Sequence, residues 1–254
     1  MLAIERRREI ISRLTANGKV IVSELAKDFG VTEETIRRDL DRLDKDGIAS
    51  KTYGGAVVRG GATFSVDLPY NVRETVNVLE KQYIAAKIAE MINDGERLML
   101  DSSSTALYVV KRIKEKKNLT IITNSVKILL ELADKQDWTV LSTGGALKKG
   151  ALSLTGSSAE KMISSYHVNT VICSCKGLDT SLGVTDSNES DSQIKQAMLA
   201  SAERRILAID CEKFDKRSFV RICDPSMLDV IVTNTAPSEK WLSFCADNGV
   251  EIVY

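Results

Sequence analysis

The sequence predicts an α/β protein in two parts: a helix-turn-helix module with a hairpin wing, then an open, mostly parallel sheet flanked by helices. Residues 1–58 contain short helical patterns followed by a glycine-punctuated hairpin. From about residue 79 onward, short apolar β-type runs alternate with amphipathic helical segments, as in open α/β sheets. The chain of 254 residues is about twice the length of a typical domain.

Residues 59–77 contain Gly60-Gly61 and Pro69 and show no sustained hydrophobic period, which predicts a linker. We therefore expect a DNA-binding-type module at 1–58, a linker at 59–77 and an effector-type domain at 78–254.

Composition excludes several classes of protein. The chain has 35 basic and 35 acidic residues, so any nucleic-acid surface must be local. Its longest apolar run, Ala106–Val110, is far shorter than the roughly 18 residues of a membrane span, and the start resembles no signal peptide. We expect a cytoplasmic protein that contacts no membrane. Five cysteines and a single histidine, His167, favour neither a disulfide framework nor a metal site, and we expect no cofactor.

The module begins with three predicted helices. The first has an apolar stripe of Ile4, Ile10, Ile11 and Leu14 and ends at Asn17-Gly18. The second spans Glu24–Phe29 with Ser23 as its cap, and the third runs from Glu33 to about Asp46 with Thr32 as its cap. Between them, Gly30-Val31-Thr32 forms the short turn of a helix-turn-helix.

The third helix has two distinct faces. Ile36, Leu40 and Leu43 form its buried stripe, and the opposite side carries Glu34, Thr35, Arg37, Arg38, Asp41 and Arg42. Arginine can pair with guanine or with phosphate, so this face suits the major groove. Glu34 and Asp41 would repel phosphate, and we expect them at the edge or paired with an arginine. The alternative is an ordinary solvated helix face.

Two short β-type runs follow, Ile48–Thr52 and Ala56–Val58, around Tyr53-Gly54-Gly55. We expect a hairpin wing whose paired glycines supply positive φ, and Lys51 and Arg59 are placed to touch the DNA backbone. The predicted DNA-binding residues are Ser23, Thr32, Thr35, Arg37, Arg38, Arg42, Lys51 and Tyr53.

The second part contains seven candidate strands and six candidate helices. The strands are Arg97–Asp101, Leu119–Thr123, Thr139–Thr143, Val168–Cys175, Arg205–Asp210, Leu228–Thr233 and Val250–Val253. The helices lie at about 79–93, 105–117, 125–135, 157–164, 189–203 and 238–248. The strands are continuous apolar runs, typical of a parallel sheet covered on both faces.

Three consecutive strands of this part end in small polar residues. Ser102 to Thr105 open a helix, where backbone N–H groups and hydroxyls favour a phosphate, although Ser104 could simply cap that helix. Thr123-Asn124-Ser125 and Thr143-Gly144-Gly145 follow the next two strands. The candidate cations are Lys148, Lys176, Lys195 and Lys213, and each could equally be a surface lysine.

Residues 22–57, VSELAKDFGVTEETIRRDLDRLDKDGIASKTYGGAV, closely resemble the DNA-binding domain of DeoR-type bacterial transcriptional regulators. The run TIRRDL at 35–40 and GGA at 54–56 carry the likeness, and Tyr53 stands where the family usually has histidine. Residues 68–105 are similar to the start of the family's effector domain, so the resemblance extends over essentially the whole chain.

That resemblance implies an effector domain like ribose-5-phosphate isomerase and related sugar-phosphate proteins. The family's motifs map onto Asp101–Thr105, Thr123-Asn124, Gly144-Gly145, Asp191 with Lys195, and Asp210 to Phe214. Asp191 replaces a usual glutamate, and Asn169 replaces a common aspartate. The effector-binding residues that we expect are Asp101, Ser102, Ser103, Ser104, Thr105, Thr123, Asn124, Gly144, Gly145, Lys148, Lys195 and Lys213.

The leading hypothesis is a non-enzymatic repressor of a sugar-catabolism operon, released from a double-stranded DNA operator by a phosphorylated sugar. We expect a homodimer or homotetramer, because one winged helix covers little DNA. The second hypothesis is a sugar-phosphate isomerase with a DNA-binding module, using Asp101, Asp179 or Asp186 as base. The third is a redox sensor working through Cys173 and Cys175, whose spacing differs from Cys-x-x-Cys sites.

Overall fold

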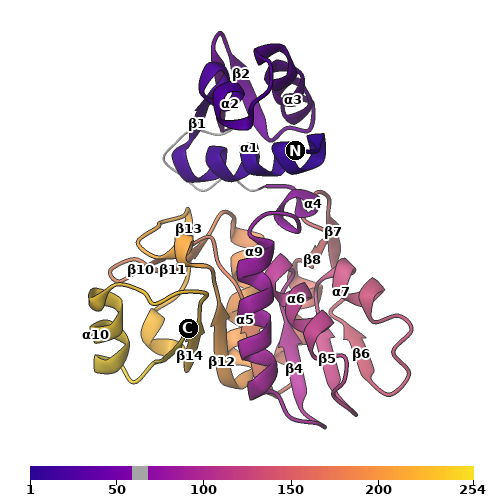
Figure 1. Cartoon of the computed structure of the whole chain (residues 1–254). Coiled ribbons are helices and arrows are strands. Elements are labelled where there is room, and N and C mark those ends of the chain that lie inside the picture. The colour runs from indigo at the N-terminus through magenta and orange to yellow at the C-terminus, as the bar shows by residue number, and fades with distance from the viewer. Residues whose placement is uncertain (59–67) are drawn as a thin grey trace. The chain divides into compact units, whose positions relative to one another are not determined.

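The computed structural model describes residues 1–58 and 68–254 and divides the chain into two compact units, Met1–Asn77 and Val78–Tyr254 (Figure 1). Among the described residues, no helix is both long enough and apolar enough to span a bilayer.

The first unit contains the predicted helix-turn-helix and wing. Its elements are α1 (Ala3–Asn17), β1 (Lys19–Ile21), α2 (Val22–Phe29), α3 (Glu33–Lys45), β2 (Ala49–Thr52), β3 (Gly55–Val58) and α4 (Tyr70–Arg73). The three strands form an antiparallel sheet in the order β1-β3-β2, so the wing hairpin acquires a third strand that the sequence did not predict.

Helix ends in this unit follow local chemistry. Gly18 ends α1 and Gly30 ends α2, both in the left-handed conformation, with φ of 73° and 63°. The Thr32 side chain caps α3 by accepting a hydrogen bond from the Thr35 N–H. The predicted cap of α2 is wrong, because that helix begins at Val22 and Ser23 lies exposed in its first turn.

The core of this unit contains the predicted apolar stripes of α1 and α3, with one exception. Ile10, Ile11 and Leu14 are buried against Ile36, Leu40 and Leu43 of α3. Ile4 does not join them, since 54% of it is exposed. It lies in the first turn of α1, a full turn before Ile10.

The wing turn lies where the sequence predicts it, but the reason given for its glycines is wrong. Neither Gly54 nor Gly55 has φ in the left-handed region. Gly55 is required by close approach instead: β3 runs between β1 and β2, and a Cβ at this position would overlap the Val20 carbonyl oxygen.

The segment expected as a linker is only partly described. Arg59, Gly60 and Gly61 lie outside the described residues. Residues 68–77 belong to the first unit, where α4 forms and where Leu68 and Val72 join the apolar core. The second unit then starts at Val78, where the sequence analysis places the start of the effector domain.

All seven predicted strands of the second unit join one parallel sheet, in the order β15-β14-β12-β9-β4-β5-β6. These strands are β4 (Arg97–Leu100), β5 (Thr120–Thr123), β6 (Thr139–Ser142), β9 (Val168–Cys173), β12 (Ala202–Ala208), β14 (Val230–Val232) and β15 (Glu251–Val253). The sheet is therefore open and parallel, as expected.

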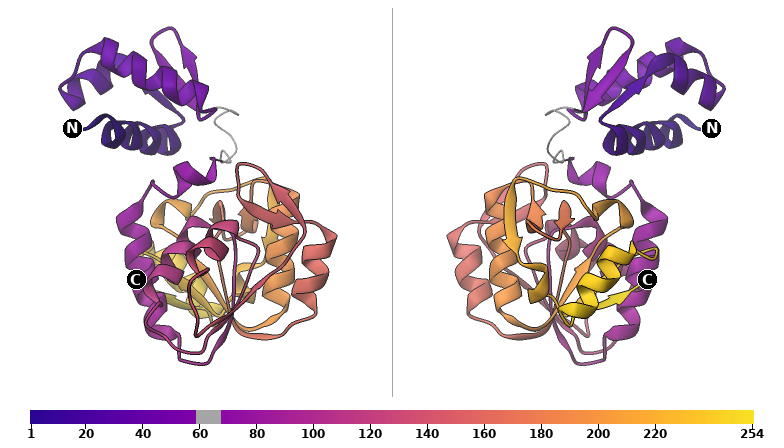
Figure 2. Two further views of the ribbon diagram at one scale, coloured as in Figure 1. Left: turned by 90° about the vertical axis from the view of Figure 1, so that its right-hand side faces the viewer. Right: turned by 90° about the vertical axis from the view of Figure 1, so that its left-hand side faces the viewer.

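The predicted helices are also present, as α5 (Val78–Met91), α6 (Ser104–Arg112), α7 (Val126–Glu131), α8 (Ser157–Ser164), α9 (Glu189–Ala200) and α10 (Glu239–Asp247). Helices α5 and α6 pack together on one face of the sheet, and α8 and α9 pack together on the other (Figure 2). Both faces are thus covered.

Two small antiparallel sheets were not predicted. One is the hairpin β7 (Ala146–Lys148) and β8 (Ser153–Thr155). The other joins β10 (Gly177–Asp179), β11 (Gly183–Asp186) and β13 (Val220–Cys223). Their strands are three or four residues long and mix polar residues and glycine with the apolar ones, so they give little periodic signal.

The strand order defines a switch point. From β4 the chain adds β5 and β6 on one side, whereas β9, β12, β14 and β15 extend the sheet on the other side. In open α/β sheets, ligands bind beyond the carboxyl ends of the strands where the order reverses. Here that position lies between the ends of β4 and β9.

Candidate functional site

The exposed face of α3 carries the predicted DNA-binding side chains. Arg37, Arg38 and Arg42 are exposed, whereas Ile36, Leu40 and Leu43 are buried on the opposite side. Thr32 and Thr35 share a hydrogen bond at the start of the helix. On the wing, Lys51 is exposed and Tyr53 lies fully exposed in the turn between β2 and β3.

Most cations of this face are paired with carboxylates. Arg37 lies 2.5 Å from Glu33 and Arg42 lies 3.2 Å from Asp46, each pair one helical turn apart. Lys51 forms an ion pair with Asp41, which was expected at the edge of the face or paired with an arginine. Glu34 is exposed, and Arg38 has no side-chain hydrogen bond or ion pair within the part of the chain that is described.

The sequence analysis did not single out Asp39, the buried acid of α3. Its carboxylate lies 2.5 Å from Arg6 Nε and 3.5 Å from Arg7 Nη1, both on α1, and its side chain is only 5% exposed. An aspartate next to Leu43 at the border of the buried stripe on the helical wheel, with arginines in the first helix, was the available signal. The pair fixes α3 against α1.

In the second unit, Asp101 organises the end of β4. Its Oδ1 accepts a hydrogen bond from the Ser103 N–H at 3.0 Å, and its Oδ2 accepts one from the Ser174 N–H at 3.1 Å. Because Ser174 directly follows β9, this carboxylate joins the two strand ends of the switch point. Asp101 is 1% exposed.

The hydroxyls after Asp101 have different roles. Ser103, rather than Ser104, caps α6 by accepting a hydrogen bond from the Ala106 N–H. The side chains of Ser102, Ser104 and Thr105 make no hydrogen bond among the described residues, and these residues keep 5–8% of their surface exposed. Their hydroxyls are therefore available to a ligand at the positive end of α6.

Lys195 lies under this loop as a buried cation. Its ammonium is 3.5 Å from Asp101 Oδ2 and contacts Asp186 Oδ2. Burial alone would lower the pKa of Lys195, but Asp186 and Asp101 outweigh it and raise this pKa. Burial alone would raise the pKa of Asp186, but the positive charges of Lys195 and Lys176 outweigh burial and lower this pKa. Both groups therefore remain charged at neutral pH.

The second loop contributes an unsatisfied acceptor. Thr123 Oγ1 donates to the Leu100 carbonyl at 2.7 Å, which ties the ends of β4 and β5 together. Asn124 Nδ2 donates to the Leu154 carbonyl, whereas Asn124 Oδ1 is buried and has no hydrogen-bond partner among the residues that the structure describes. A buried carbonyl oxygen without a partner is costly, and a donor from a bound ligand would satisfy it.

The third loop leads into the β7–β8 hairpin. Gly144 and Gly145 have left-handed φ of 63° and 102°, and a Cβ on Gly145 would lie 2.6 Å from the Thr155 carbonyl oxygen. Lys148 then reaches Asp191 on α9, with the ammonium 2.7 Å from the carboxylate. Asp191 thus binds the hairpin, while Lys195, one turn further along α9, binds Asp101 and Asp186.

Lys213 lies at the end of β12, in the single turn η1 (Cys211–Lys213) that Asp210 caps. It is half-buried and has no ion pair among the residues described here. The predicted residues Asp101, Lys195 and Ser103 are brought together at the switch point, whereas Lys148, on the β7–β8 hairpin, pairs with Asp191. Asp186 and Ser174, which complete the network, were absent from the predicted site.

A winged helix-turn-helix unit joined to an α/β unit with polar residues at its switch point defines a class: DNA-binding regulators with a ligand-sensing domain. The comparisons with known proteins agree. Residues 6–60 match the DeoR-like helix-turn-helix domain, and residues 76–235 match the DeoR C terminal sensor domain. The chain belongs to the DeoR family of transcriptional regulators.

Relatives extend over the whole chain. An uncharacterized HTH-type transcriptional regulator of Bacillus subtilis, YulB, is 36% identical over 99% of this chain and 96% of its own length. A putative aga operon transcriptional repressor of Escherichia coli O157:H7 is 31% identical, covering 98% and 93%. The glycerol-3-phosphate regulon repressor of Escherichia coli K12 is 27% identical, covering 99% of each chain.

Among solved structures, ribose 5-phosphate isomerase from Plasmodium falciparum aligns with a TM-score of 0.40 and 16% identity, over 54% of this chain and 52% of that chain. A similarity this weak carries no conclusion about ligand or activity.

Proposed function

We propose that this regulator represses a carbohydrate-catabolism operon and is released from its operator by a phosphorylated sugar. Family membership makes it a transcriptional regulator. The names of its relatives, repressors of an aga operon and of a glycerol-3-phosphate regulon, favour repression and a phosphorylated carbon source.

The DNA interface consists of α3, the start of α2 and the wing. Arg38 is the residue best suited to direct base contact, because it is exposed and engaged with no carboxylate of the described chain. Arg37, Arg42 and Lys51 contact phosphate or neighbouring bases. Ser23, Thr32, Thr35 and Tyr53 surround them with hydroxyl groups that suit the DNA backbone.

Changing Arg38 to alanine tests this interface. A lost bidentate base contact costs about 1–3 kcal/mol per site, and a dimer loses two such contacts. The probe is a duplex that the wild-type protein selects from a random library. Unchanged gel-shift affinity of Arg38→Ala for that duplex would contradict the proposed role.

The proposed sensor site rests on polar groups at the ends of neighbouring strands. These groups make no hydrogen bond among the described residues. Ser102, Ser104 and Thr105 offer hydroxyls at the start of α6, and Asn124 Oδ1 offers a buried acceptor. A phosphate gains charge-assisted hydrogen bonds at a helix N-terminus, and a sugar hydroxyl can donate to the asparagine. Lys213, which is half-buried and has no ion pair among the described residues, is the cation that we assign to the ligand.

Calorimetric titration with matched pairs of sugar phosphates and free sugars tests this site. We expect at least one phosphorylated member to bind, and its unphosphorylated partner to bind far more weakly. Equal affinity for both members of every pair would contradict a phosphate site at α6.

The chemistry of Asp179 and Asp186 argues against either of them as the base of an isomerase. A general base for proton abstraction works best with a pKa near neutrality. Asp186 has a lowered pKa and is paired with Lys195, and hydrogen bonds from Ser181 and Arg217 hold the pKa of Asp179 low. NMR of a mixed sugar-phosphate sample with the protein should show no isomerisation.

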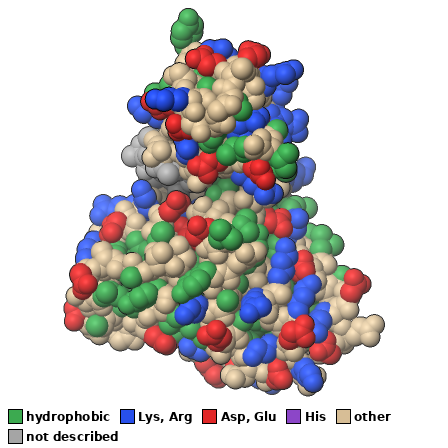
Figure 3. All heavy atoms as spheres, in the orientation of Figure 1, with side chains coloured by type: hydrophobic (Ala, Val, Ile, Leu, Met, Phe, Trp, Pro, Cys, Tyr) green, Lys and Arg blue, Asp and Glu red, His purple; other side chains and the backbone are tan. Residues whose placement is uncertain are grey.

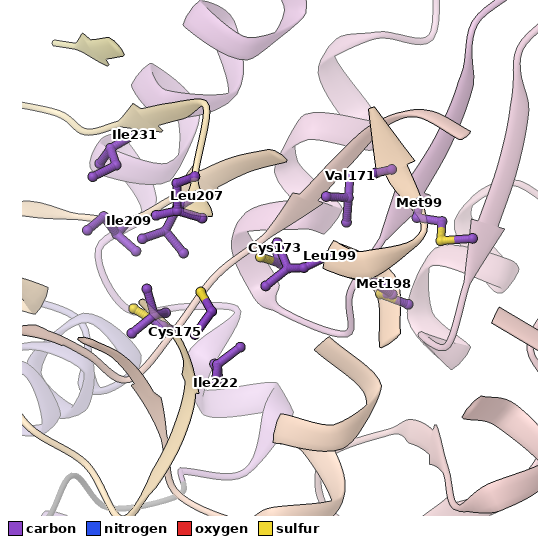
Figure 4. Close-up of a cluster of buried hydrophobic side chains, with 14 of the residues drawn as sticks. Met99, Val171, Cys173, Cys175, Met198, Leu199, Leu207, Ile209, Ile222 and Ile231 are labelled. Carbon is purple, nitrogen blue, oxygen red and sulfur yellow. The ribbon is translucent and has the colours of Figure 1, made fainter. Parts of the chain in front are cut away.

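The thiols argue against the redox alternative. Cys173 ends β9 and Cys175 lies just beyond it, and Figure 4 shows both sulfurs among buried apolar side chains. Burial raises the pKa of the Cys175 thiol to about 12 and that of Cys173 well above its usual value. Thiols of this kind are poor nucleophiles at neutral pH. DNA affinity should therefore not respond to mild peroxide.

We also propose a homodimer or homotetramer, because a single winged helix covers too little DNA for the usual specificity. Light scattering coupled to size exclusion measures this directly. A monomer both alone and on DNA would contradict the proposal.

A further inference from the structure

The proposed DNA-binding face is electrically balanced in the free protein. Its cations are Arg37, Arg38, Arg42, Lys45 and Lys51, and its carboxylates are Glu33, Glu34, Asp41, Asp44 and Asp46. Three of these cations are engaged by Glu33, Asp46 and Asp41. In Figure 3, acidic and basic side chains are likewise interspersed over residues 1–58 on the face shown.

The Lys51–Asp41 pair differs from the other two. Arg37–Glu33 and Arg42–Asp46 each lie within α3 at a spacing of four residues, a common arrangement on helix surfaces. Lys51 is on β2 and Asp41 is on α3, so their pair joins the wing to the recognition helix. The side chains are 37% and 48% exposed, so an incoming phosphate can reach both.

We propose that Asp41 limits the electrostatic affinity of the DNA interface: its carboxylate competes with DNA phosphate for Lys51 and thereby weakens binding to DNA of any sequence. This inference rests on the proposed function, in which α3 and the wing contact the operator. The Asp41 carboxylate regulates the same surface that the proposed function assigns to DNA.

Binding of a DNA phosphate by Lys51 requires an exchange of ion-pair partners. When Lys51 binds a phosphate, it must leave Asp41, so one ion pair replaces another and the freed carboxylate faces the negatively charged duplex. Binding to any sequence therefore gains little from Lys51. Base contacts by Arg38 do not have this cost, because Arg38 has no carboxylate partner among the described residues. The carboxylate thus lowers the affinity for DNA of any sequence and does not act on the base contacts of Arg38.

The experiment compares Asp41→Asn with Glu34→Gln in the full-length protein. Both variants remove one negative charge from the same face of α3, but only the first releases a paired cation. Affinity for a short duplex of arbitrary sequence is measured over a series of salt concentrations, and thermal unfolding checks that each variant is folded.

We expect Asp41→Asn to bind the arbitrary duplex about two- to fivefold more tightly than Glu34→Gln does, the range measured for exposed ion pairs. Its salt dependence should steepen by up to about one unit in log–log slope, the value for one additional phosphate contact. In a Lys51→Ala background, Asp41→Asn should have no more effect than Glu34→Gln.

Two outcomes overturn the inference. If Asp41→Asn and Glu34→Gln behave alike, the effect is one of net charge. If the effect of Asp41→Asn persists in the Lys51→Ala background, it does not act through Lys51. In both cases Arg38→Ala still weakens binding to the selected duplex, and the proposed function stands. If the wild-type protein binds no duplex at all, the proposed function fails and the inference fails with it.

Discussion

Single side chains show which features of the DNA-binding unit are encoded locally. Helical periodicity alone placed Ile36, Leu40 and Leu43 inside and Arg37, Arg38 and Arg42 outside, and the structure agrees. Ion-pair partners could not be predicted in this way. Asp41 meets Lys51 because the wing strand returns beside α3, and Asp39 meets Arg6 because α1 packs across α3. Both contacts depend on tertiary packing rather than on sequence spacing.

The Arg6–Asp39 ion pair should stabilise the first unit. Asp39→Asn should lower the free energy of unfolding of the first unit by about 3–5 kcal/mol, because it leaves Arg6 buried without a countercharge. The matched control is Asp44→Asn on the same helix, where the carboxylate has no ion pair in the described part of the chain. Urea unfolding followed by far-UV circular dichroism measures both. Equal losses would mean that burial of Asp39 has little energetic consequence.

Among the strands of the second unit, continuous apolar runs predicted every strand of the large parallel sheet. The short strands of the two small antiparallel sheets were not predicted. Boundaries moved by a few residues, as at β12, which begins at Ala202 rather than Arg205. One pairing joins strands distant in sequence, since β11 pairs with β13 although α9 and β12 lie between them along the chain. A period of two residues over three positions cannot reveal such pairing.

The wing turn allows a matched test of close approach. Gly55→Ala should lower stability by about 1–3 kcal/mol, because the new methyl group would overlap the Val20 carbonyl oxygen. Gly54→Ala should be tolerated, since no atom lies within 4 Å of its would-be Cβ and its φ is not left-handed. Thermal unfolding of the two variants distinguishes them. Similar midpoints would show that the wing shifts to accommodate the methyl group.

The β10–β11 turn should show a specific response to acid. Hydrogen bonds from Ser181 and Arg217 hold the pKa of Asp179 below its usual 3.8. The stabilisation is therefore complete above about pH 4 and is lost as the pH falls through the lower, folded pKa. The difference in unfolding free energy between wild type and Asp179→Asn should be constant at mild pH and shrink on acidification. A difference that grows below pH 4 would contradict this assignment.

For the molecule as a whole, apolar runs in the sequence predicted which segments form strands. They did not predict the order of those strands in the sheet. The candidate site depends on that order, because Asp101 and Ser174 meet only when β9 pairs with β4. Loops after β4, β5 and β6 could be recognised from their polar residues. Ser174 and Asp186 could not, because their role depends on which strands become neighbours. The resemblance to a known family pointed to the same loops, and the topology explains why they converge.

The two units should be separable in unfolding. Both tryptophans, Trp138 and Trp241, lie in the second unit, so fluorescence reports on that unit while circular dichroism reports on both. Urea curves from the two probes should not coincide, because each unit has its own apolar core. Asp39→Asn should move only the circular dichroism curve. Coincident curves in both proteins would indicate a single cooperative unit.

Regulation requires that the sensor ligand change the affinity for DNA, and a tenfold change requires a coupling free energy of only about 1.4 kcal/mol. The double variant Ser104→Ala, Thr105→Ala removes two hydroxyls that make no hydrogen bond among the described residues, so the fold should persist. It should bind the selected duplex like wild type and respond weakly to the phosphorylated sugar, giving constant repression. Ser103→Ala is the control, because it removes the cap of α6 and should lower stability by about 1 kcal/mol. Operator affinity of all three proteins with and without the ligand decides the matter, and a wild-type response in the double variant would place the phosphate elsewhere.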